Sequence, residues 1–442
     1  MPETAVFVAT DLTDVMLEVL GAEDVIDWAR PLTPTLDMIE ATKQIPFDGR
    51  TEGKHFVFGL RTAGSANPMV GVGSSQRTTG LPIAGKPTYD RLIYNTAKHV
   101  QAFELEGDVF DALRGGDESM LDSYMDIMRD QATDWRAEEN KIVLGDGSGR
   151  IATLTARDNG AHTITVSDNS RLDVGRQIVI RYGTTGALLG GQAAGTALVI
   201  TSKSSDGVTC GVTDEDGSTV TLSDPSAGGY YAFPYDAQGK VMNGLQIICS
   251  DSDPTTWGNS GTDALGGLLR SAQPLWAGYR LSAASAMLDV QAHLQPFLDH
   301  IRKRGAKWAK PDGRGVQWYA ITGYQNFRVL EHALTVGERV PPRLKLAKDN
   351  RMYDAIDYEG AAFMIDADAN PANVLTFAPA TIRRWERKAP HWDDRTGSIW
   401  HRTLANDGRD ADIFKAYMQN MSQLIAVCAL PNGELYSTAA TE

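Results

Sequence analysis

The sequence has few cysteines, no long apolar run and an acidic start. Its three cysteines, Cys210, Cys249 and Cys428, are scattered singly along 442 residues, and such an odd, unpaired set argues against a disulfide framework or a zinc cage. The longest apolar runs, such as residues 424–430, are far shorter than the roughly 18 residues that a membrane span needs. A secretory signal would begin with basic residues. We therefore expect a protein of the cytoplasm, with reduced thiols and no membrane partner.

The charge balance disfavours tight binding to nucleic acid. The chain has 56 acidic and 42 basic residues, a net charge of -14, whereas affinity for nucleic acid comes mainly from Lys and Arg side chains that displace counterions. The balance fits a protein that is indifferent to DNA, and it equally fits one that lies beside DNA without gripping it.

Common catalytic signatures are also missing. The sequence has no Gly-x-Ser-x-Gly elbow and no His-Glu-x-x-His pair, so it lacks the usual marks of serine hydrolases and metalloproteases. The Gly-rich residues 145–149 lack the Lys-Ser/Thr ending of a phosphate loop. Acidic pairs such as Glu138-Glu139 and Asp366/Asp368 could serve acid-base catalysis in a cleft, but such pairs are abundant in any acidic chain.

Two clusters have the residue types of metal ligands. His391, Asp393, Asp394 and His401 could offer imidazoles and carboxylates to a divalent ion, and residues 214–217 resemble the opening of a calcium loop without its far acidic residue. The first cluster is better interpreted as a surface turn at a strand, and the second as a hairpin turn. We predict no catalytic residues, no metal site, no cofactor and no enzymatic activity.

One stretch, Arg150 to Phe233, differs in composition from its flanks. It contains none of the 13 Met and 9 Trp residues of the chain, and only one Glu and one Lys. It alternates small, Thr and β-branched residues, with turn signals at Asn159-Gly160, Asp206-Gly207 and Asp216-Gly217, a pattern typical of short strands joined by hairpins. The flanks share one Met- and Trp-rich composition. The stretch is therefore predicted to be an all-β module inserted into a host domain.

The residues before the module suggest an arm and a long hairpin. Pro31, Pro34 and Pro46 prevent a continuous helix, so we interpret the N-terminal residues as an extended arm. Two strands are predicted, at 55–61 and 89–106, and about 27 residues rich in Gly, Ser, Thr and Pro separate them. A connector of this length is usually a functional or disordered loop.

A long helix is predicted from Asp117 to Leu144. Asp117 is a suitable N-cap, and apolar residues recur at a spacing of three to four from Leu121 to Ile142. A row of acidic residues follows every fourth position of the same helix, so like charges lie on neighbouring turns. The row is either a solvated face or a ridge matched by basic residues of a partner subunit. The row consists of Asp122, Asp126, Asp130, Asp134 and Glu138.

The chain after the module is predicted to be mixed α/β. Helices are expected at 281–304, with a kink at Pro296, and at 324–335. Strands are expected at 316–322, 362–365, 374–377 and 413–430.

This order of parts resembles the major capsid protein of tailed bacteriophages, the Hong Kong phage capsid fold. The resemblance rests on an arm, a long hairpin with a Gly/Pro-rich tip, an acidic amphipathic helix and an α/β lobe that returns through a long C-terminal strand. It implies an α+β chain with an N-arm, an E-loop hairpin, a P-domain with a long spine helix and an A-domain, together with the inserted all-β domain. The implied ranges are 1–52 for the N-terminal arm, 53–100 for the E-loop, 101–149 for the P-domain with its spine helix, 150–233 for the inserted β domain, 234–398 for the A-domain, and 399–442 for the P-domain return strand and C-terminus.

The resemblance implies a structural protein that assembles with itself into hexameric and pentameric capsomers of an icosahedral shell around double-stranded DNA. It further implies a virion capsid assembled in the host cytoplasm, a portal and a separate scaffolding protein as partners, and it allows for a decoration protein. The candidates for contacts between subunits are Arg77, Lys86, Asp122, Asp126, Asp130, Asp134 and Glu138. Some members join subunits by a Lys to Asn bond, for which Lys86 would be the donor, but no acceptor such as Asn406 or Asn420 can be singled out.

Three other functions fit parts of the sequence. An encapsulin-like protein compartment resembles the same fold, although the greater length and the β module favour a virus. A carbohydrate-active enzyme with a β binding module would explain the acidic pairs, but the module has no Trp to stack on sugars. A tail or adhesin protein would show internal repeats, and none is found.

Overall fold

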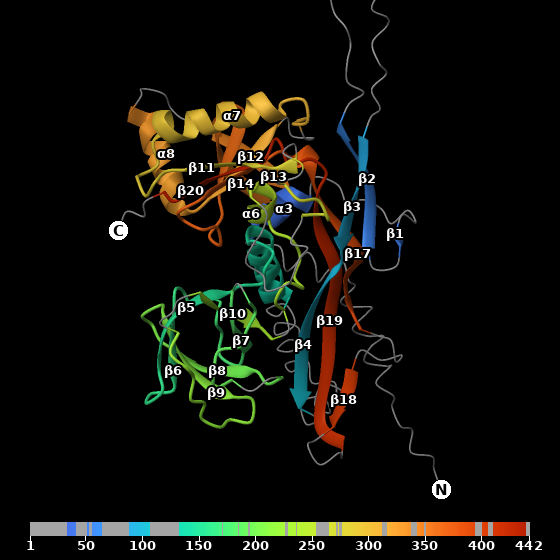
Figure 1. Cartoon of the computed structure of the whole chain (residues 1–442), viewed down its shortest axis with the longest axis vertical. Helices are drawn as coiled ribbons and strands as arrows, with labels where there is room; N and C mark the ends of the chain where they lie inside the picture. Colours follow the sequence, from blue (N-terminus) through green and yellow to red (C-terminus); the bar gives the residue numbers. More distant parts are fainter. Residues whose placement is uncertain are drawn as a thin grey trace, which may run out of the picture.

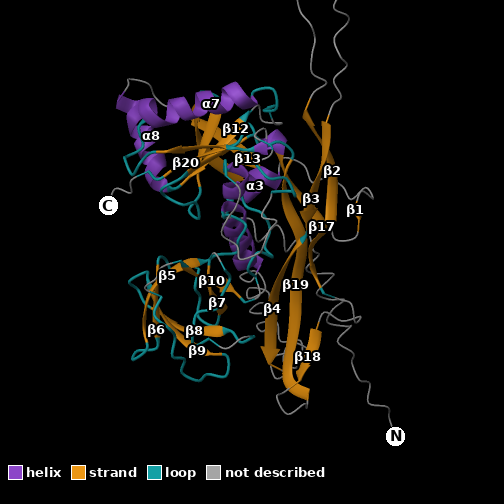
Figure 2. Cartoon of the chain, viewed as in Figure 1, coloured by secondary structure: helices purple, strands orange, loops and turns teal. Residues whose placement is uncertain are grey.

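The structure of the protein is a computed structural model, and it is viewed in Figure 1 down its shortest axis. A lobe that contains α7 and α8 lies above a small barrel, and a long sheet around β19 runs along one side of both. Figure 2 shows that the labelled helices belong to the upper lobe and its junction with the long sheet, whereas the barrel consists of strands. The described residues are 33–40, 51–52, 55–63, 88–106, 132–169, 171–183, 185–192, 195–225, 229–235, 237–252, 265–270, 273, 276–311, 316–336, 343–348, 351–393, 400–404 and 410–438.

The upper lobe is built on a seven-stranded mixed sheet with the order β11-β20-β16-β12-β15-β14-β13. Its central strand β12 pairs in parallel with β15 and antiparallel with β16. The strands are β11 (Tyr279–Ser282), β12 (Trp318–Thr322), β13 (Arg343–Lys348), β14 (Arg351–Tyr358), β15 (Ala361–Ile365), β16 (Val374–Phe377) and β20 (Gly433–Tyr436).

Both faces of this sheet are covered, which explains why every residue of β12 is buried. Trp318 and Ala320 point to one face, where they join a cluster that includes residues of α7 (Gln295–Gly305) and α8 (Tyr324–Val336). Tyr319 and Ile321 point to the other face, into a cluster with residues of α3 (Pro34–Glu40) and α6 (Leu245–Cys249). A strand buried on both faces has a continuous apolar sequence because neither side meets water.

The long sheet is organised by one strand, β19 (Asp410–Ala426). It pairs antiparallel with β4 (Ala97–Glu106), β17 (Ile382–Trp392) and β18 (Trp400–Leu404). At a rise of about 3.3 Å per residue such a strand spans about 55 Å. It therefore connects the upper lobe to the level of the barrel.

The predicted hairpin is present, but its second strand is shorter than expected. β2 (His55–Ala63) pairs antiparallel with β3 (Thr88–Asn95), and the short β1 (Thr51–Glu52) adds to its edge. The prediction of one strand over 89–106 was wrong. The chain leaves the first sheet at Asn95, and β4 continues in the long sheet, because β19 offers a separate pairing edge that propensity alone cannot reveal.

The stretch of unusual composition forms a closed barrel with the order β10-β5-β6-β9-β8-β7. Its core cluster draws only on residues between Ile151 and Ala232, and the predicted turns at 159–160, 206–207 and 216–217 lie between or after strands, as expected. Closure leaves the barrel without free edges. The strands are β5 (Ala152–Asp158), β6 (Thr163–Val166), β7 (Gln177–Tyr182), β8 (Leu198–Lys203), β9 (Thr209–Asp214) and β10 (Tyr230–Pro234).

The helix expected at 281–304 begins later than predicted. β11 takes residues 279–282, a π-helical turn (Val290–Leu294) follows, and α7 begins at Gln295. Asp289 caps the turn by accepting hydrogen bonds from the backbone N–H groups of Gln291 and Ala292. Pro296 lies in the first turn of α7, directly after the π-helical turn, so the position predicted for a kink is where π-helical bonding gives way to α-helical bonding.

The arm also differs from the expectation at one place. Residues 34–40, predicted to be extended, form α3, and Pro34 is its first residue. Leu36, Met38 and Ile39 are completely buried. The rest of the predicted arm lies outside the described residues, apart from Thr33 and the short β1.

Further elements complete the described chain. A helix covers residues 132–144, and its end at 144 agrees with the prediction, whereas its predicted start at Asp117 lies outside the described residues. A short 3-10 turn (Pro379–Thr381) precedes β17. Within the described ranges, no helix has the length and apolar character to cross a membrane.

We predict that the barrel can be removed without unfolding the rest. The chain enters and leaves it on adjacent strands, since the Ile151 N–H donates to the Ala232 carbonyl at 2.9 Å. A variant in which a Gly-Ser-Gly linker replaces residues 150–233 is therefore expected to unfold cooperatively in guanidinium chloride, as followed by circular dichroism. It should carry Glu138→Gln, because excision removes both arginines that neutralise Glu138. A broad, non-cooperative transition of this variant would show that the barrel is part of the main core.

Candidate functional site: a buried polar junction on the central helix

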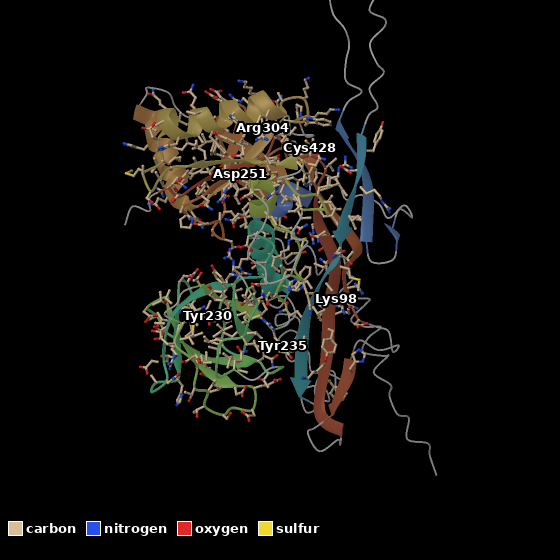
Figure 3. All side chains as sticks on the ribbon, viewed as in Figure 1. Lys98, Tyr230, Tyr235, Asp251, Arg304 and Cys428 are labelled. Carbon is tan, nitrogen blue, oxygen red and sulfur yellow. The ribbon has the colours of Figure 1, made fainter. Side chains whose placement is uncertain are left out.

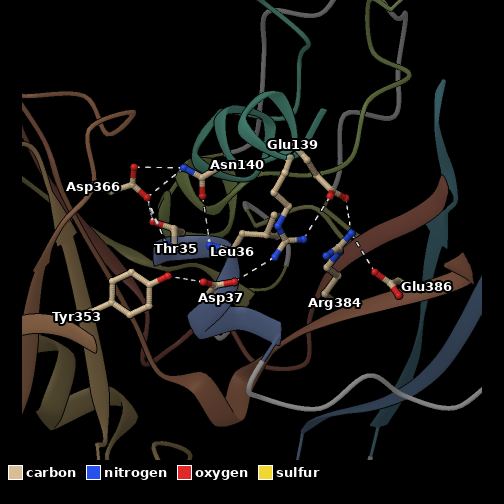
Figure 4. Close-up of polar contacts among 10 residues, drawn as sticks. Thr35, Leu36, Asp37, Glu139, Asn140, Tyr353, Asp366, Arg384 and Glu386 are labelled. Carbon is tan, nitrogen blue, oxygen red and sulfur yellow. Dashed lines mark hydrogen bonds and ion pairs between the residues drawn. The ribbon is translucent and has the colours of Figure 1, made fainter. Parts of the chain in front are cut away.

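The helix at 132–144, called the central helix below, carries three polar residues on one buried face. Arg136, Glu139 and Asn140 are all less than 3% exposed. Their spacing of three and four positions places them on neighbouring turns of the same face. Charged groups are rarely buried unless they are paired. The partners of these three residues, shown in Figure 4, therefore identify the elements that pack on the central helix.

Glu139 connects the central helix to the long sheet. Its Oε1 accepts from Arg384 of β17 and, at 3.0 Å, from the Asn420 side-chain amide of β19. Arg384 also forms an ion pair with Glu386 at 2.9 Å. Arg384 is 1% exposed, so removal of either partner would leave a charge buried without its main compensation.

Arg136 connects the central helix to α3. Its Nη2 lies 3.2 Å from Asp37 Oδ1, and its Nη1 lies 3.7 Å from Glu139 Oε2. The second carboxylate oxygen of Asp37 accepts from the hydroxyl of Tyr353 in β14. Asp37 therefore joins α3 to both the central helix and the seven-stranded sheet.

Asn140 completes the junction at the end of β15. Its Oδ1 accepts from the Leu36 N–H at 3.3 Å, and its Nδ2 donates to Asp366 at 3.1 Å and to Asp368 at 2.9 Å. Asp366 also accepts from the side chain and the backbone N–H of Thr35. These donors favour the ionised form of Asp366, but burial outweighs them and raises the pKa of its carboxyl above the usual range.

The neighbouring residue, Glu138, faces the barrel. Its Oε1 accepts from Arg171 and from Arg176, both at 2.8 Å. Burial alone would raise the pKa of Glu138, but the two guanidinium groups dominate and hold it at about 2. The acidic pair Glu138-Glu139 is therefore divided between two contacts, and the two carboxylates do not face a common cleft.

A further contact of the central helix lies beside a cavity. The ring of Trp135 stacks on His99 of β4, with centroids 5.1 Å apart, and burial lowers the pKa of His99 to about 4. The cavity, of about 1030 Å³, is lined by β4, the central helix and the segment that leaves the barrel. Lys98 and Tyr235, which Figure 3 labels, are part of this lining.

The predicted contact residues are only partly placed. Arg77, Lys86, Asp122, Asp126 and Asp130 lie outside the described residues. Asp134 is exposed on the central helix, and Glu138 is paired within its own chain. Asn420, considered as an acceptor for Lys86, is fully buried against Glu139, and Asn406 lies outside the described residues.

Sequence reasoning missed the junction, although one signal was present. The apolar spacing of the central helix predicts buried positions after Ala132 and Trp135, and residues 136 and 139 occupy them with Arg and Glu. A charged pair in an apolar stripe indicates buried partners elsewhere. Nothing in the sequence identifies those partners, because Arg384 lies 245 positions from Glu139.

The described residues offer little for chemistry. All three cysteines are buried, and burial raises the pKa of each thiol, to about 11 for Cys428, so they are poor nucleophiles at neutral pH. No group of three or more His, Cys, Asp or Glu side chains in this part of the chain is placed to hold a metal ion. Within the cluster weighed as a metal site, a ring nitrogen of His401 lies 3.3 Å from the backbone carbonyl oxygen of Asp393, and Asp394 lies outside the described residues.

Comparison with solved structures assigns the fold. No family model and no curated protein sequence matches the chain. A chain of the cyanophage A-1(L) capsid asymmetric unit is similar over 92% of this chain and 93% of its own, with a TM-score of 0.52 and 11% identity. The capsid of an empty GTA particle (TM-score 0.43, 8% identity, 93% and 92% covered) and a chain from Mycobacterium phage Cain (0.41, 8%, 92% and 90%) are more distant. The chain has the fold of a phage capsid protein.

The first prediction from the junction concerns stability. Arg384→Met should lower the free energy of unfolding by about 3–5 kcal/mol, because it leaves Glu139 buried without its closest cation. The double variant Arg384→Met with Glu139→Gln should recover a large part of this loss. Guanidinium denaturation measures the free energy of unfolding of both variants. Lys203→Met is the control, because the ion pair of Lys203 with Asp173 is exposed and contributes only about 0–1 kcal/mol. Equal small losses at Arg384 and Lys203 would refute the importance of the buried pair.

The second prediction concerns pH. Because the pKa of Glu138 is depressed to about 2 in the folded chain, its contribution is present above the unfolded value of about 4.5 and is lost as pH falls toward 2. The stability difference between the wild type and Glu138→Gln should therefore be about 1–3 kcal/mol at pH 7 and should shrink between pH 4.5 and 2.5. Urea denaturation at several pH values measures it. A difference that does not vary with pH would contradict the ion pairs with Arg171 and Arg176.

Proposed function

We propose that this protein is the major capsid protein of a tailed phage, and that copies of it form the hexamers and pentamers of an icosahedral shell around double-stranded DNA. The observation that carries the proposal is the similarity of fold to the cyanophage A-1(L) capsid chain over nearly the whole length of both chains. A capsid role also fits a net charge of -14, since an acidic lining confines packaged DNA without binding it tightly.

The parts of the chain have distinct roles in this proposal. Residues 1–52 act as the N-terminal arm, 53–100 as the E-loop, and 101–149 as the P-domain with its spine helix. Residues 150–233 form an inserted domain on the outer face of the shell. Residues 234–398 serve as the A-domain, and 399–442 as the returning strand of the P-domain and the C-terminus.

The described strands refine this division in one respect. β17 lies within the range 234–398 but pairs with β19, and β20 lies within 399–442 but belongs to the seven-stranded sheet. The chain thus crosses between the two sheets more than once after residue 380. In the proposed shell this crossing ties the A-domain to the P-domain within each subunit.

The hairpin supports a role between subunits. Tyr89 and Ile93 of β3 are 65% and 42% exposed, whereas Leu92 and Tyr94 on the opposite face are buried. Large apolar side chains on an exposed strand face are typical of surfaces that another molecule covers. We propose that the hairpin, with Arg77 and Lys86, and the acidic residues Asp122 to Asp134 contact neighbouring subunits.

The role is structural and requires no cofactor. Buried thiols and acidic pairs that are separated or bonded within the fold offer no evident catalytic arrangement among the described residues. The partners we propose are a portal and a separate scaffolding protein, with assembly in the host cytoplasm. A decoration protein is a further partner that the exposed barrel could accommodate.

Electron microscopy of the purified protein tests this function. The expected result is closed icosahedral particles, formed alone or with a co-expressed scaffolding protein. Analysis of their content separates a virus shell from an enzyme-filled compartment, because native particles should contain double-stranded DNA and no cargo enzyme. Small monodisperse species under every condition would count against the proposal.

A further inference from the structure

Three exposed lysines lie at the C-terminal end of α7 and just beyond it. Lys303, Lys307 and Lys310 are exposed, and Trp308, which lies between Lys307 and Lys310 in the sequence, is 54% exposed. We call these four residues the lysine patch. Residues 302–310 contain five basic residues and no acidic one. This is unusual in a chain of net charge -14.

The neighbouring arginines have partners, whereas the lysine side chains have none among the described residues. Arg302 forms ion pairs with Asp299 and Glu359, and Arg304 donates to the backbone carbonyls of Gly278 and Ala277. Figure 3 labels Arg304 in the upper lobe, at α7. Over the described part of the chain, none of the three lysine side chains has an ion pair or a hydrogen-bond partner. The positive charge of the patch is therefore available to another molecule.

The patch is held rigidly. The backbone of Ala306 donates to Arg302 and that of Ala309 to Gly305, at 3.0 and 3.1 Å, so helical bonding continues past the end of α7. Ala309 is buried, and Gly305 packs against Pro431 so closely that a side chain would not fit. Lys303 and Lys307, four positions apart, thus lie on one face. A surface that is ordered before binding loses little backbone entropy when a partner arrives.

Two features favour a protein partner over DNA. Three lysines would add little affinity for a phosphate backbone, since the net charge of the chain repels DNA at longer range. The half-exposed indole of Trp308 gains by burial against apolar atoms, and tryptophan is enriched at the centres of protein interfaces. A partner surface that combines carboxylates with apolar atoms satisfies both the lysines and the indole.

We propose that the lysine patch binds a carboxylate-bearing surface of a second copy of this chain. The proposal rests on the proposed shell function, which places copies side by side at high local concentration. Charge complementarity supports a second copy as the partner, because each copy carries 56 acidic residues against 42 basic ones. A local basic patch lets subunits that repel one another overall approach in one orientation.

Cross-linking of assembled particles tests the contact directly. Particles are formed from a mixture of ¹⁴N-labelled and ¹⁵N-labelled chains and treated with a carbodiimide, which joins a lysine amine to a carboxylate only when the two are in contact. Mass spectrometry should find mixed-label peptides that link Lys303, Lys307 or Lys310 to Asp or Glu. Mixed-label links from other residues with none from these lysines would overturn the inference and leave the shell function standing. Absence of particles would instead count against the proposed function.

Variants test the energetic role. Lys303→Glu/Lys307→Glu/Lys310→Glu should raise the protein concentration needed for assembly about tenfold or more, because attraction becomes repulsion. The matched triple Lys→Arg variant should assemble like the wild type, and Trp308→Ala should weaken assembly without a change in its salt dependence. Circular dichroism checks that each variant is folded.

One further outcome would overturn the inference. When intact particles are treated with an acetylating reagent, the three lysines should be protected from modification to the same extent in empty and DNA-filled shells. Protection only in DNA-filled shells, with normal assembly of the triple Glu variant, would identify DNA as the partner of the patch.

Discussion

The ion pair between Glu139 and Arg384 is the contact on which the arrangement of this chain depends. Both side chains are almost completely buried, so each charge is costly unless the other is in place. The pair requires the central helix and β17 to adopt one relative position. Arg136 and Asp37 extend the same constraint to α3. We expect this pair to fix the position of the central helix on the long sheet more than it adds to the net free energy of folding.

The central helix also fixes the positions of other parts of the chain, because its successive residues point in different directions. Trp135 contacts β4, Arg136 and Asn140 contact α3, Glu138 holds the barrel, and Glu139 holds the long sheet. At about 100° per residue, one turn and a half of helix thus touches three separate parts of the chain: α3, the barrel and the long sheet through two of its strands. In a shell subunit this coupling would keep the body rigid while the hairpin and the lysine patch meet neighbouring copies.

Local signals in the sequence were sufficient for some elements. The all-β character of residues 150–233 and the strand at Val374–Phe377 were predicted. The strand predicted at 316–322 is found at Trp318–Thr322, and the helix predicted at 324–335 is found at Tyr324–Val336. Alternation, apolar runs and turn residues act over a few positions, so the sequence is enough to locate such elements. The predictions failed where contacts with residues far away in the sequence determine the local structure. The break at Asn95, the buried helix α3 and the late start of α7 depend on packing against elements far along the chain. Of the site, the sequence indicated the acidic row and the acidic pairs Glu138-Glu139 and Asp366/Asp368, but none of their partners. Glu138 proved to be paired within its own chain.

Native-state hydrogen exchange of α3 tests the central role of the junction most directly. If the buried ion pairs and hydrogen bonds join α3 to the central helix and both sheets, the backbone amides of residues 37–39 should exchange only through global unfolding. Their free energies of exchange should then equal those of β12 and should fall by the same amount in Arg384→Met. Fast exchange of α3, with β12 still protected, would show that the helix is only loosely attached and would contradict the account.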